Sequence, residues 1–353
     1  MSRSIESGVG SPSTSEDVII EARDVAVSFG MARGESKVVD DVDLDIRRNE
    51  ILGIVGESGS GKSMLASSLL DAVVDPGTLT GSVTYHPSDG EPVDIVSASE
   101  SELKRLRWEE ISFAIQGAQS AFNPTMTIGT HFDETLRAHD ADVDAGLDHA
   151  RELLRDLYLD PELVLESYPH ELSGGMKQRA LVALSLVLEP DVLVMDEPTA
   201  ALDLLMQRSI IGLLQQIKEK YGLTLVFVTH DLPLVADIAD RIAVMYAFSI
   251  VELGPTEAIL ADSAHPYTRA LLNAVPDLST PAAEVSPIEG SSPDPVDVPQ
   301  GCSYSPRCPL ADSQCLNDDP PFYEVGDEHV SACHYWEAAR SDLASGRAGG
   351  DDA

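Results

Sequence analysis

Basic residues are scarce in this chain of 353 residues. It contains 23 Lys and Arg residues against 60 Asp and Glu residues, which gives a formal net charge of −37 at pH 7. Nucleic-acid binding is therefore disfavoured, because proteins that bind nucleic acids usually carry a basic patch or stripe. The acidic residues are spread along the chain, which indicates a surface suited to the salt-rich cytoplasm of a halophile. At about 1 M salt the Debye length falls to roughly 3 Å, and this screens the self-repulsion of so many charges.

Long apolar runs are also missing. No stretch of about 18 apolar residues exists, so the sequence predicts no membrane span. The first eight residues lack the apolar stretch of a signal peptide. We therefore expect a cytosolic protein whose membrane role, if it has one, comes through partners.

The most informative segment that is present is a phosphate-binding loop of the form G-x-x-x-x-G-K-S. It follows the apolar run 51–55 and precedes a helical run, 64–70, which is the strand–loop–helix context that the motif requires. Lys62 is expected to reach the β- and γ-phosphates and Ser63 to ligate Mg²⁺. A Gly/Ser-rich turn between two core elements is the alternative, but the complete motif favours a nucleoside triphosphate. The loop consists of Gly56, Glu57, Ser58, Gly59, Ser60, Gly61, Lys62 and Ser63.

Two later apolar strands end in polar residues that suit phosphate chemistry. Asp196 and Glu197 follow the run 191–195, and His230 follows the run 225–229. At the ends of parallel strands such side chains point into the phosphate crevice. We expect Asp196 to hold Mg²⁺, Glu197 to polarise the attacking water, and His230 to contact the γ-phosphate or orient that water. Acidic surface residues and a lone surface histidine are the alternative interpretation.

A second group suited to phosphate lies at a helix start, where Ser173, Gly174 and Gly175 expose free N–H groups. An ordinary helix cap with flexible glycines is the alternative. Because the chain already has one phosphate loop, a second one suggests that a nucleotide is held between two chains.

As an ordered set, these motifs resemble the ATP-binding subunit of ABC transporters. The resemblance covers about residues 18–285 and implies a P-loop NTPase core of α/β type with antiparallel β and α-helical subdomains. It further implies that Phe29 stacks on adenine, that Gln116 is the Q-loop glutamine and a Mg²⁺ ligand, and that Asp203 belongs to the D-loop. On the same basis His230 is similar to the switch histidine.

The segments 116–124 and 265–272 resemble those of dipeptide and oligopeptide importers. That resemblance implies an ATPase motor on the cytoplasmic face of the membrane. Its partners would be a second ABC ATPase subunit, two transmembrane permease subunits and an extracellular solute-binding protein. An importer for nickel or another small solute, and a soluble non-transport ABC ATPase, are the alternatives. Residues 247–250 depart from the family, which usually has a Gly-Arg pair there.

Only four cysteines are present, and all lie near the C-terminus, with 5, 6 and 17 residues between them. A reducing cytosol disfavours disulfides, whereas four thiolates suit tetrahedral Zn²⁺ or an iron–sulfur cluster. The similar importer tails indicate a [4Fe–4S] cluster, and unconnected thiols are the other possibility. The residues are Cys302, Cys308, Cys315 and Cys333.

The sequence predicts five regions. A disordered N-terminus (1–17) precedes an ABC ATPase domain (18–264), whose helical subdomain spans about 117–184. A helix and linker (265–300) lead to a Cys-rich C-terminal region (301–340), and a disordered tail (341–353) ends the chain.

Overall fold

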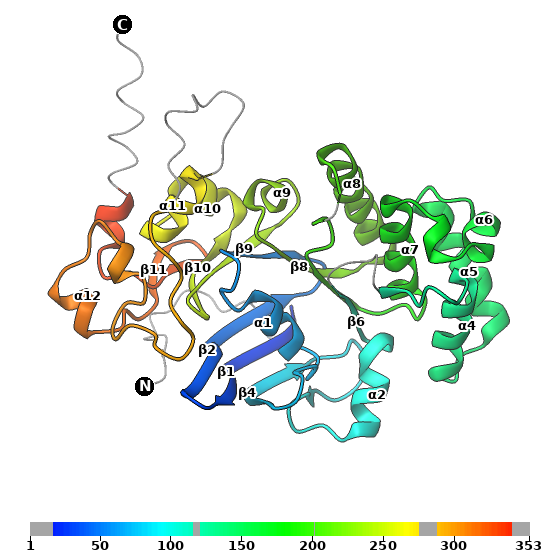
Figure 1. The fold of residues 1–353 in the computed structure, drawn as a ribbon, viewed down its shortest axis with the longest axis horizontal. Helices are drawn as coiled ribbons and strands as arrows, with labels where there is room; N and C mark the ends of the chain where they lie inside the picture. The colour runs from blue at the N-terminus through cyan, green and yellow to red at the C-terminus, as the bar shows by residue number, and fades with distance from the viewer. Residues whose placement is uncertain (1–16, 116–120, 201, 275–287, 341–353) are drawn as a thin grey trace, which may run out of the picture.

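The fold is taken from a computed structural model that describes residues 17–115, 121–200, 202–274 and 288–340 (Figure 1). The predictions of disorder for 1–16 and 341–353 lie outside these residues. So do Gln116 and residues 275–287, a part of the predicted helix and linker.

The main sheet has eight strands in the order β11-β12-β10-β9-β3-β8-β7-β6. The five strands from β9 to β6 are parallel. They are near-continuous apolar runs, as expected for strands buried on both faces. The bounds are β3 (Ile51–Val55), β6 (Ile111–Ala114), β7 (Val192–Asp196), β8 (Thr224–Thr229), β9 (Arg241–Tyr246) and β10 (Ser249–Pro255).

Alternate residues of the central strands belong to two hydrophobic cores. In β3, Leu52 and Ile54 pack toward the second sheet, whereas Ile51 and Val55 pack on the opposite side. This division follows from the period of two along a strand. The central sheet is thereby covered on both faces, and the ends of its strands are left for a site.

The second sheet is antiparallel, in the order β2-β1-β4-β5. Hydrophobic side chains of β1 and β2 alternate with polar ones and share a core with helix α1. Figure 1 shows this sheet beside α1 and below the main sheet. The bounds are β1 (Val18–Met31), β2 (Gly34–Arg47), α1 (Lys62–Ser68), β4 (Gly77–Tyr85) and β5 (Val93–Asp94), followed by α2 (Glu100–Glu109).

A group of helices between β6 and β7 forms a separate lobe at one end of the molecule (Figure 1). Side chains of Thr127, Asp142, Asp160 and Ser173 cap four of them by accepting a backbone N–H. The helices are α4 (Ile128–Ala138), α5 (Val143–Asp156), α6 (Pro161–Glu166), the short η1 (Pro169–Glu171) and α7 (Gly174–Leu186). Among the described residues, no helix is both long and apolar enough to cross a membrane.

The remaining helices lie between or after the core strands. They are α8 (Leu204–Tyr221), α9 (Leu232–Ala236), α10 (Thr256–Asp262) and α11 (Pro266–Asn273). Asp203 and Asp231 cap the first two with their carboxylates.

The C-terminal segment does not stand apart from the ATPase core but adds two strands to the main sheet. Strand β12 pairs with β10 through Glu252 opposite Ser331 and Leu253 opposite Val330, and β11 pairs with β12. A buried contact supports the junction, since His329 Nε2 lies 2.8 Å from Glu252 Oε1. The elements are η2 (Ser305–Arg307), α12 (Ser313–Asn317), β11 (Tyr323–Gly326) and β12 (His329–Ser331).

The unusual residues at 247–250 form the tight hairpin between β9 and β10. Ala247 and Phe248 both have positive φ, 46° and 73°. Such turns usually contain Gly or Asn, because other residues are strained there. Phe248 is nevertheless useful: its N–H donates to Ser60 O at 3.0 Å, and its carbonyl accepts from Asp40 N at 2.9 Å. The hairpin therefore holds the phosphate loop through a backbone hydrogen bond to Ser60.

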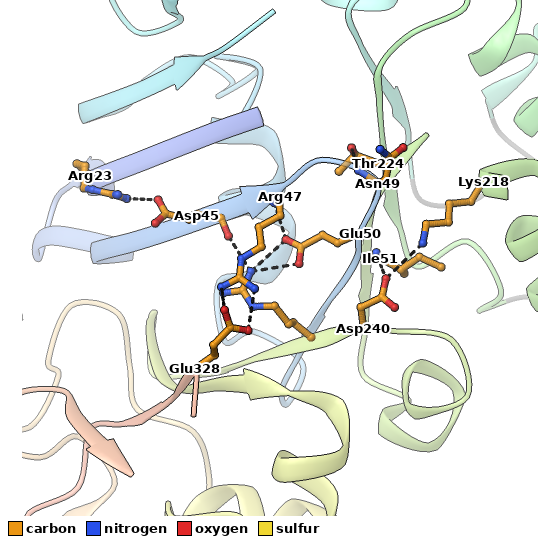
Figure 2. A network of polar contacts seen from close by, with 11 residues as sticks. Arg23, Asp45, Arg47, Asn49, Glu50, Ile51, Lys218, Thr224, Asp240 and Glu328 are labelled. Carbon is orange, nitrogen blue, oxygen red and sulfur yellow. Dashed lines mark hydrogen bonds and ion pairs between the residues drawn. The ribbon is translucent and has the colours of Figure 1, made fainter. Parts of the chain in front are cut away.

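A polar network secures the start of β3, the strand that leads into this loop (Figure 2). Glu50 precedes β3 and accepts from the guanidinium of Arg241 at 3.1 and 3.2 Å. Both side chains are buried, with 7% and 9% exposed. Nearby, Arg47 pairs with Glu328 at 2.7 Å and so ties β2 to the C-terminal segment.

Candidate nucleotide-binding site

The phosphate loop connects β3 to α1, and its shape depends on glycine. Gly61 has φ +103°, and a Cβ there would lie 2.3 Å from Val38 O. Gly56 is equally restricted, because a Cβ would lie 2.2 Å from Met245 O. The tight approach of the loop to its neighbours therefore excludes larger residues at both positions.

Lys62 is folded back into the loop. Its Nζ donates to Gly56 O at 2.9 Å and to Glu57 O at 2.8 Å. The residue is 5% exposed, and burial lowers the pKa of the ammonium, while Glu197, Asp196 and Glu57 oppose that effect. A third, longer bond at 3.5 Å goes to Ser60 Oγ. A buried ammonium bonded to neutral oxygens is well placed to exchange them for phosphate oxygens.

Asp196 ends β7 and lies against the start of α1. Ser63 Oγ donates to Asp196 Oδ1 at 3.0 Å, and Asp196 is 5% exposed. Burial raises the pKa of Asp196, and the Ser63 bond partly offsets this. A hydroxyl and a carboxylate at this spacing suit Mg²⁺, which usually takes one or two protein ligands together with phosphate oxygens and waters.

Glu197 and His230 meet beyond the ends of the neighbouring strands β7 and β8. His230 Nδ1 lies 2.7 Å from Glu197 Oε1. Glu197 N donates to Val228 O at 2.8 Å, and its φ of +49° lies in the left-handed region. Such strain in a non-glycine residue is concentrated at functional sites. The carboxylate is 13% exposed and the imidazole 60%, so His230 is the member of the pair that is open to solvent.

Three side chains that sequence reasoning missed hold Glu57, the second residue of the loop. Tyr267 Oη accepts from Glu57 N at 2.8 Å. Arg307 donates to both Glu57 carboxylate oxygens, at 2.7 and 3.0 Å, and this bond raises the pKa of the guanidinium. Ser292 Oγ donates to the same carboxylate at 3.3 Å. Tyr267 lies in the importer-like segment 265–272, but no motif marks its contact or those of Ser292 and Arg307, because the three lie 210–250 residues from Glu57.

Other predicted site residues lie elsewhere. Ser173 caps α7, and a Cβ on Gly175 would lie 2.1 Å from Met206 Cε of α8. In the described part of the chain, no hydrogen bond or ion pair joins residues 173–175 to the phosphate loop. Asp203 caps α8 by accepting from Leu205 N and Met206 N. Phe29 is half-buried and lies opposite Gly77 of β4.

The cysteines give a divided result. They line one cavity, together with Tyr304 and Tyr335, and burial raises the pKa of Cys333 to about 12, with the other three cysteines adding to that shift. Over the described ranges, however, no group of three or more His, Cys, Asp or Glu residues is arranged to hold a metal ion. The described residues therefore show no site for a metal ion, and the predicted iron–sulfur cluster stays a prediction. The cavity is formed by Cys302, Cys308, Cys315 and Cys333.

Two protein families match this chain. Residues 39–200 match the family described as ABC transporter. Residues 251–315 match the oligopeptide/dipeptide transporter C-terminal region. The second match begins in the strand β10 on which the C-terminal segment is assembled.

Similar proteins extend over nearly the whole chain. The dipeptide transport ATP-binding protein DppD of Caldanaerobacter subterraneus subsp. tengcongensis is 40% identical over 92% of this chain and 98% of its own length. The oligopeptide transport ATP-binding protein OppD of Salmonella typhimurium is 37% identical over 90% and 93%. The dimeric structure of MJ0796, a bacterial ABC transporter cassette, superposes with a TM-score of 0.58 and 27% identity, over 67% of this chain and 99% of that one. The protein therefore belongs to the ATP-binding subunits of the dipeptide and oligopeptide ABC transporter family.

Proposed function

We propose that this protein is the ATP-hydrolysing motor of a membrane importer for dipeptides or oligopeptides. The observation that carries the proposal is the convergence of two pairs, Ser63 with Asp196 and Glu197 with His230, on one phosphate loop. Its relatives, named for dipeptide and oligopeptide transport, support the cargo class.

In this mechanism each residue has a separate task. Lys62 binds the β- and γ-phosphates, while Ser63 and Asp196 hold Mg²⁺. Glu197 polarises the water that attacks the γ-phosphorus, and His230 orients this carboxylate and the terminal phosphate. Gln116, outside the described residues, is proposed to complete the Mg²⁺ shell and to signal to the helical lobe.

The second phosphate-binding group is proposed to act on a neighbouring ATPase subunit. Ser173, Gly174 and Gly175 would close over the nucleotide held by the partner's loop. Beside Asp203, Leu204 and Leu205 are 76% and 81% exposed, although both are apolar. Exposed apolar side chains of this kind favour a partner surface, and the related MJ0796 structures are dimeric. Phe29 is proposed to stack on the adenine.

The remaining partners are proposed to be two permease subunits and an extracellular solute-binding protein, with this chain bound to the inner face of the membrane. The test is to reconstitute the chain with its second ATPase subunit and permeases in vesicles. A mixed dipeptide and tripeptide library is supplied with the binding protein, at high salt. We expect ATP hydrolysis and uptake to rise together with peptide.

Two outcomes would contradict this assignment. Stimulation by Ni²⁺, but not by peptides, would favour the alternative importer for a small solute. Hydrolysis that never depends on permeases, in a chain that stays out of the membrane fraction, would favour a non-transport ABC ATPase.

We infer further that the four cysteines bind a [4Fe–4S] cluster rather than zinc. Each thiolate of such a cluster binds a different iron, so the sulfur atoms need not converge on one ion. Their shared cavity and their position in one segment support this inference. Anaerobic purification should yield about four iron atoms per chain and visible charge-transfer absorbance. Stoichiometric zinc, or protein without metal, would reject the cluster.

A further inference from the structure

Arg307 of the C-terminal segment contacts the phosphate loop. Arg307 lies in the short turn η2, directly before Cys308, and its guanidinium forms a two-pronged ion pair with Glu57. The Arg307 side chain is 6% exposed and that of Glu57 is 25% exposed. Burial of this kind limits screening by salt, so the pair should persist in brine.

Arg307 is itself held firmly on the C-terminal side. Its Nε donates to Glu289 O at 2.7 Å, and its guanidinium lies over the rings of Tyr246 and Tyr304, at 5.6 and 5.9 Å from their centres. These tyrosines pack on Tyr267, whose hydroxyl accepts from Glu57 N. Both the carboxylate and the backbone of Glu57 are thus tied to one aromatic cluster.

The turn that carries Arg307 is shaped by the cysteines. Ser305 N donates to Cys302 O at 2.9 Å, and Cys302 N donates to Cys315 O at 2.8 Å. Cys302 and Cys308 lie on either side of the turn and line the common cavity. A change in the arrangement of the cysteines would therefore shift the turn that carries Arg307.

The electrostatic consequence concerns ATP. Glu57 is a carboxylate within the loop that must accept a strongly negative triphosphate, and an unpaired carboxylate there would repel it. Its contact with Arg307 neutralises this charge and holds the loop backbone. We propose that Arg307 is a positioning residue through which the cysteine-containing C-terminal segment sets the affinity of the phosphate loop for Mg-ATP. This proposal rests on the proposed function, because it assumes that the loop binds ATP.

The first test is steady-state hydrolysis by the full chain with its partner subunit. Arg307→Gln should raise the KM for Mg-ATP about tenfold and change kcat less than twofold, since Arg307 contacts no reacting atom. Arg307→Lys should recover part of the affinity. Adding Glu57→Gln to Arg307→Gln should bring the KM back toward the wild-type value, because the unpaired charge is then removed. A purely structural role for Arg307 predicts no such rescue.

A control is available in Arg47, which pairs with Glu328 of the C-terminal segment near the start of β3, whereas the phosphate loop follows the end of that strand. Arg47→Gln should leave the KM for Mg-ATP unchanged. An equal rise in both variants would overturn the proposal, because it would indicate general loosening of the segment. An unchanged KM in folded Arg307→Gln would also overturn it.

The second test does not depend on turnover or on the Arg307 variants folding. Because coupling between two sites is reciprocal, Mg-ATP should slow hydrogen exchange in residues 302–316 of the wild-type chain at least threefold. Glu57→Gln, which breaks the pair from the ATPase side, should reduce this protection. Equal protection in both proteins would refute the coupling. If the wild-type chain neither binds nor hydrolyses Mg-ATP, the proposed function itself is wrong, and this result differs from a loss of coupling in a chain that does bind Mg-ATP.

Discussion

His230 Nδ1 lies 2.7 Å from Glu197 Oε1, and this contact joins the ends of the adjacent strands β7 and β8. The imidazole is more exposed than the carboxylate, 60% against 13%. A γ-phosphate bound over the loop would then contact the exposed His230, while Glu197 stays more buried. We propose that the pair provides an orienting group and a base from two neighbouring strand ends.

Glu197→Gln should lower kcat by about 10²–10⁴-fold, the range expected when a positioned general base is lost. The amide is nearly the same size, so Mg-ATP binding should survive and a closed dimer should accumulate. Turnover by rapid mixing and dimer formation by size exclusion measure the two effects. Asp144→Asn, an acidic residue in the first turn of α5, is the control and should behave as wild type. Normal turnover in Glu197→Gln would remove this residue from its role.

Asp196→Asn should stabilise the nucleotide-free protein at pH 7–8. Burial raises the pKa of Asp196 in the folded state, so the charged form there is disfavoured relative to the unfolded chain. The folded protein then binds more protons, and stability falls as pH rises from the ordinary Asp pKa of about 4 through the raised value. The gain in melting temperature should thus vanish below about pH 4. With Mg-ATP present, the wild type should melt at the higher temperature, because Asp196 is needed to hold Mg²⁺ well. If Mg-ATP raises the melting temperature of the variant as much as that of the wild type, the Mg²⁺ role of Asp196 is contradicted.

Arg241→Met should lower the free energy of unfolding by about 3–5 kcal/mol, because it leaves Glu50 buried without its charge partner. Replacing Glu50 as well, by Gln, should restore part of the loss. The exposed pair of Arg137 with Asp133 is the control, and Arg137→Met should cost less than about 1 kcal/mol. Denaturant melts measure all three variants. Equal effects at the two sites would refute the importance of burial.

Salt should stabilise the protein strongly, since we propose that its charge of −37 is an adaptation to brine. Raising KCl from about 0.1 to 2 M shortens the Debye length from roughly 10 Å to below 3 Å and screens the repulsion. We expect the melting temperature to rise by at least 10 °C. Sucrose at equal osmolality serves as the control for general osmotic effects. A melting temperature that is flat in KCl would contradict the halophilic proposal.

The ATPase fold could be predicted mainly from local motifs. The phosphate loop, its preceding strand at 51–55 and the helix that follows were all recognised from residue order. The apolar runs before Asp196 and His230 likewise became β7 and β8. These features are visible in a sequence because they depend on neighbours a few residues apart: backbone geometry, strand period and turn chemistry.

The C-terminal segment shows where such reasoning stops. Its four cysteines suggested a region of its own, but its strands extend the main sheet beyond β10, and no single-ion group forms among the described cysteines. Residues 247–250 depart from the family in sequence, yet the backbone N–H of Phe248 donates to Ser60 O in the phosphate loop. Contacts of this kind depend on which elements become neighbours.

Residue order alone determined the strand–loop–helix that cradles phosphate, because glycine, lysine and serine act there at fixed short spacing. Tertiary structure alone decided that Arg307 meets Glu57, 250 residues away along the chain. This is because an ion pair forms only where packing brings two opposite charges together at a partly buried site. Among 60 acidic side chains nothing in the sequence marks which one will be there.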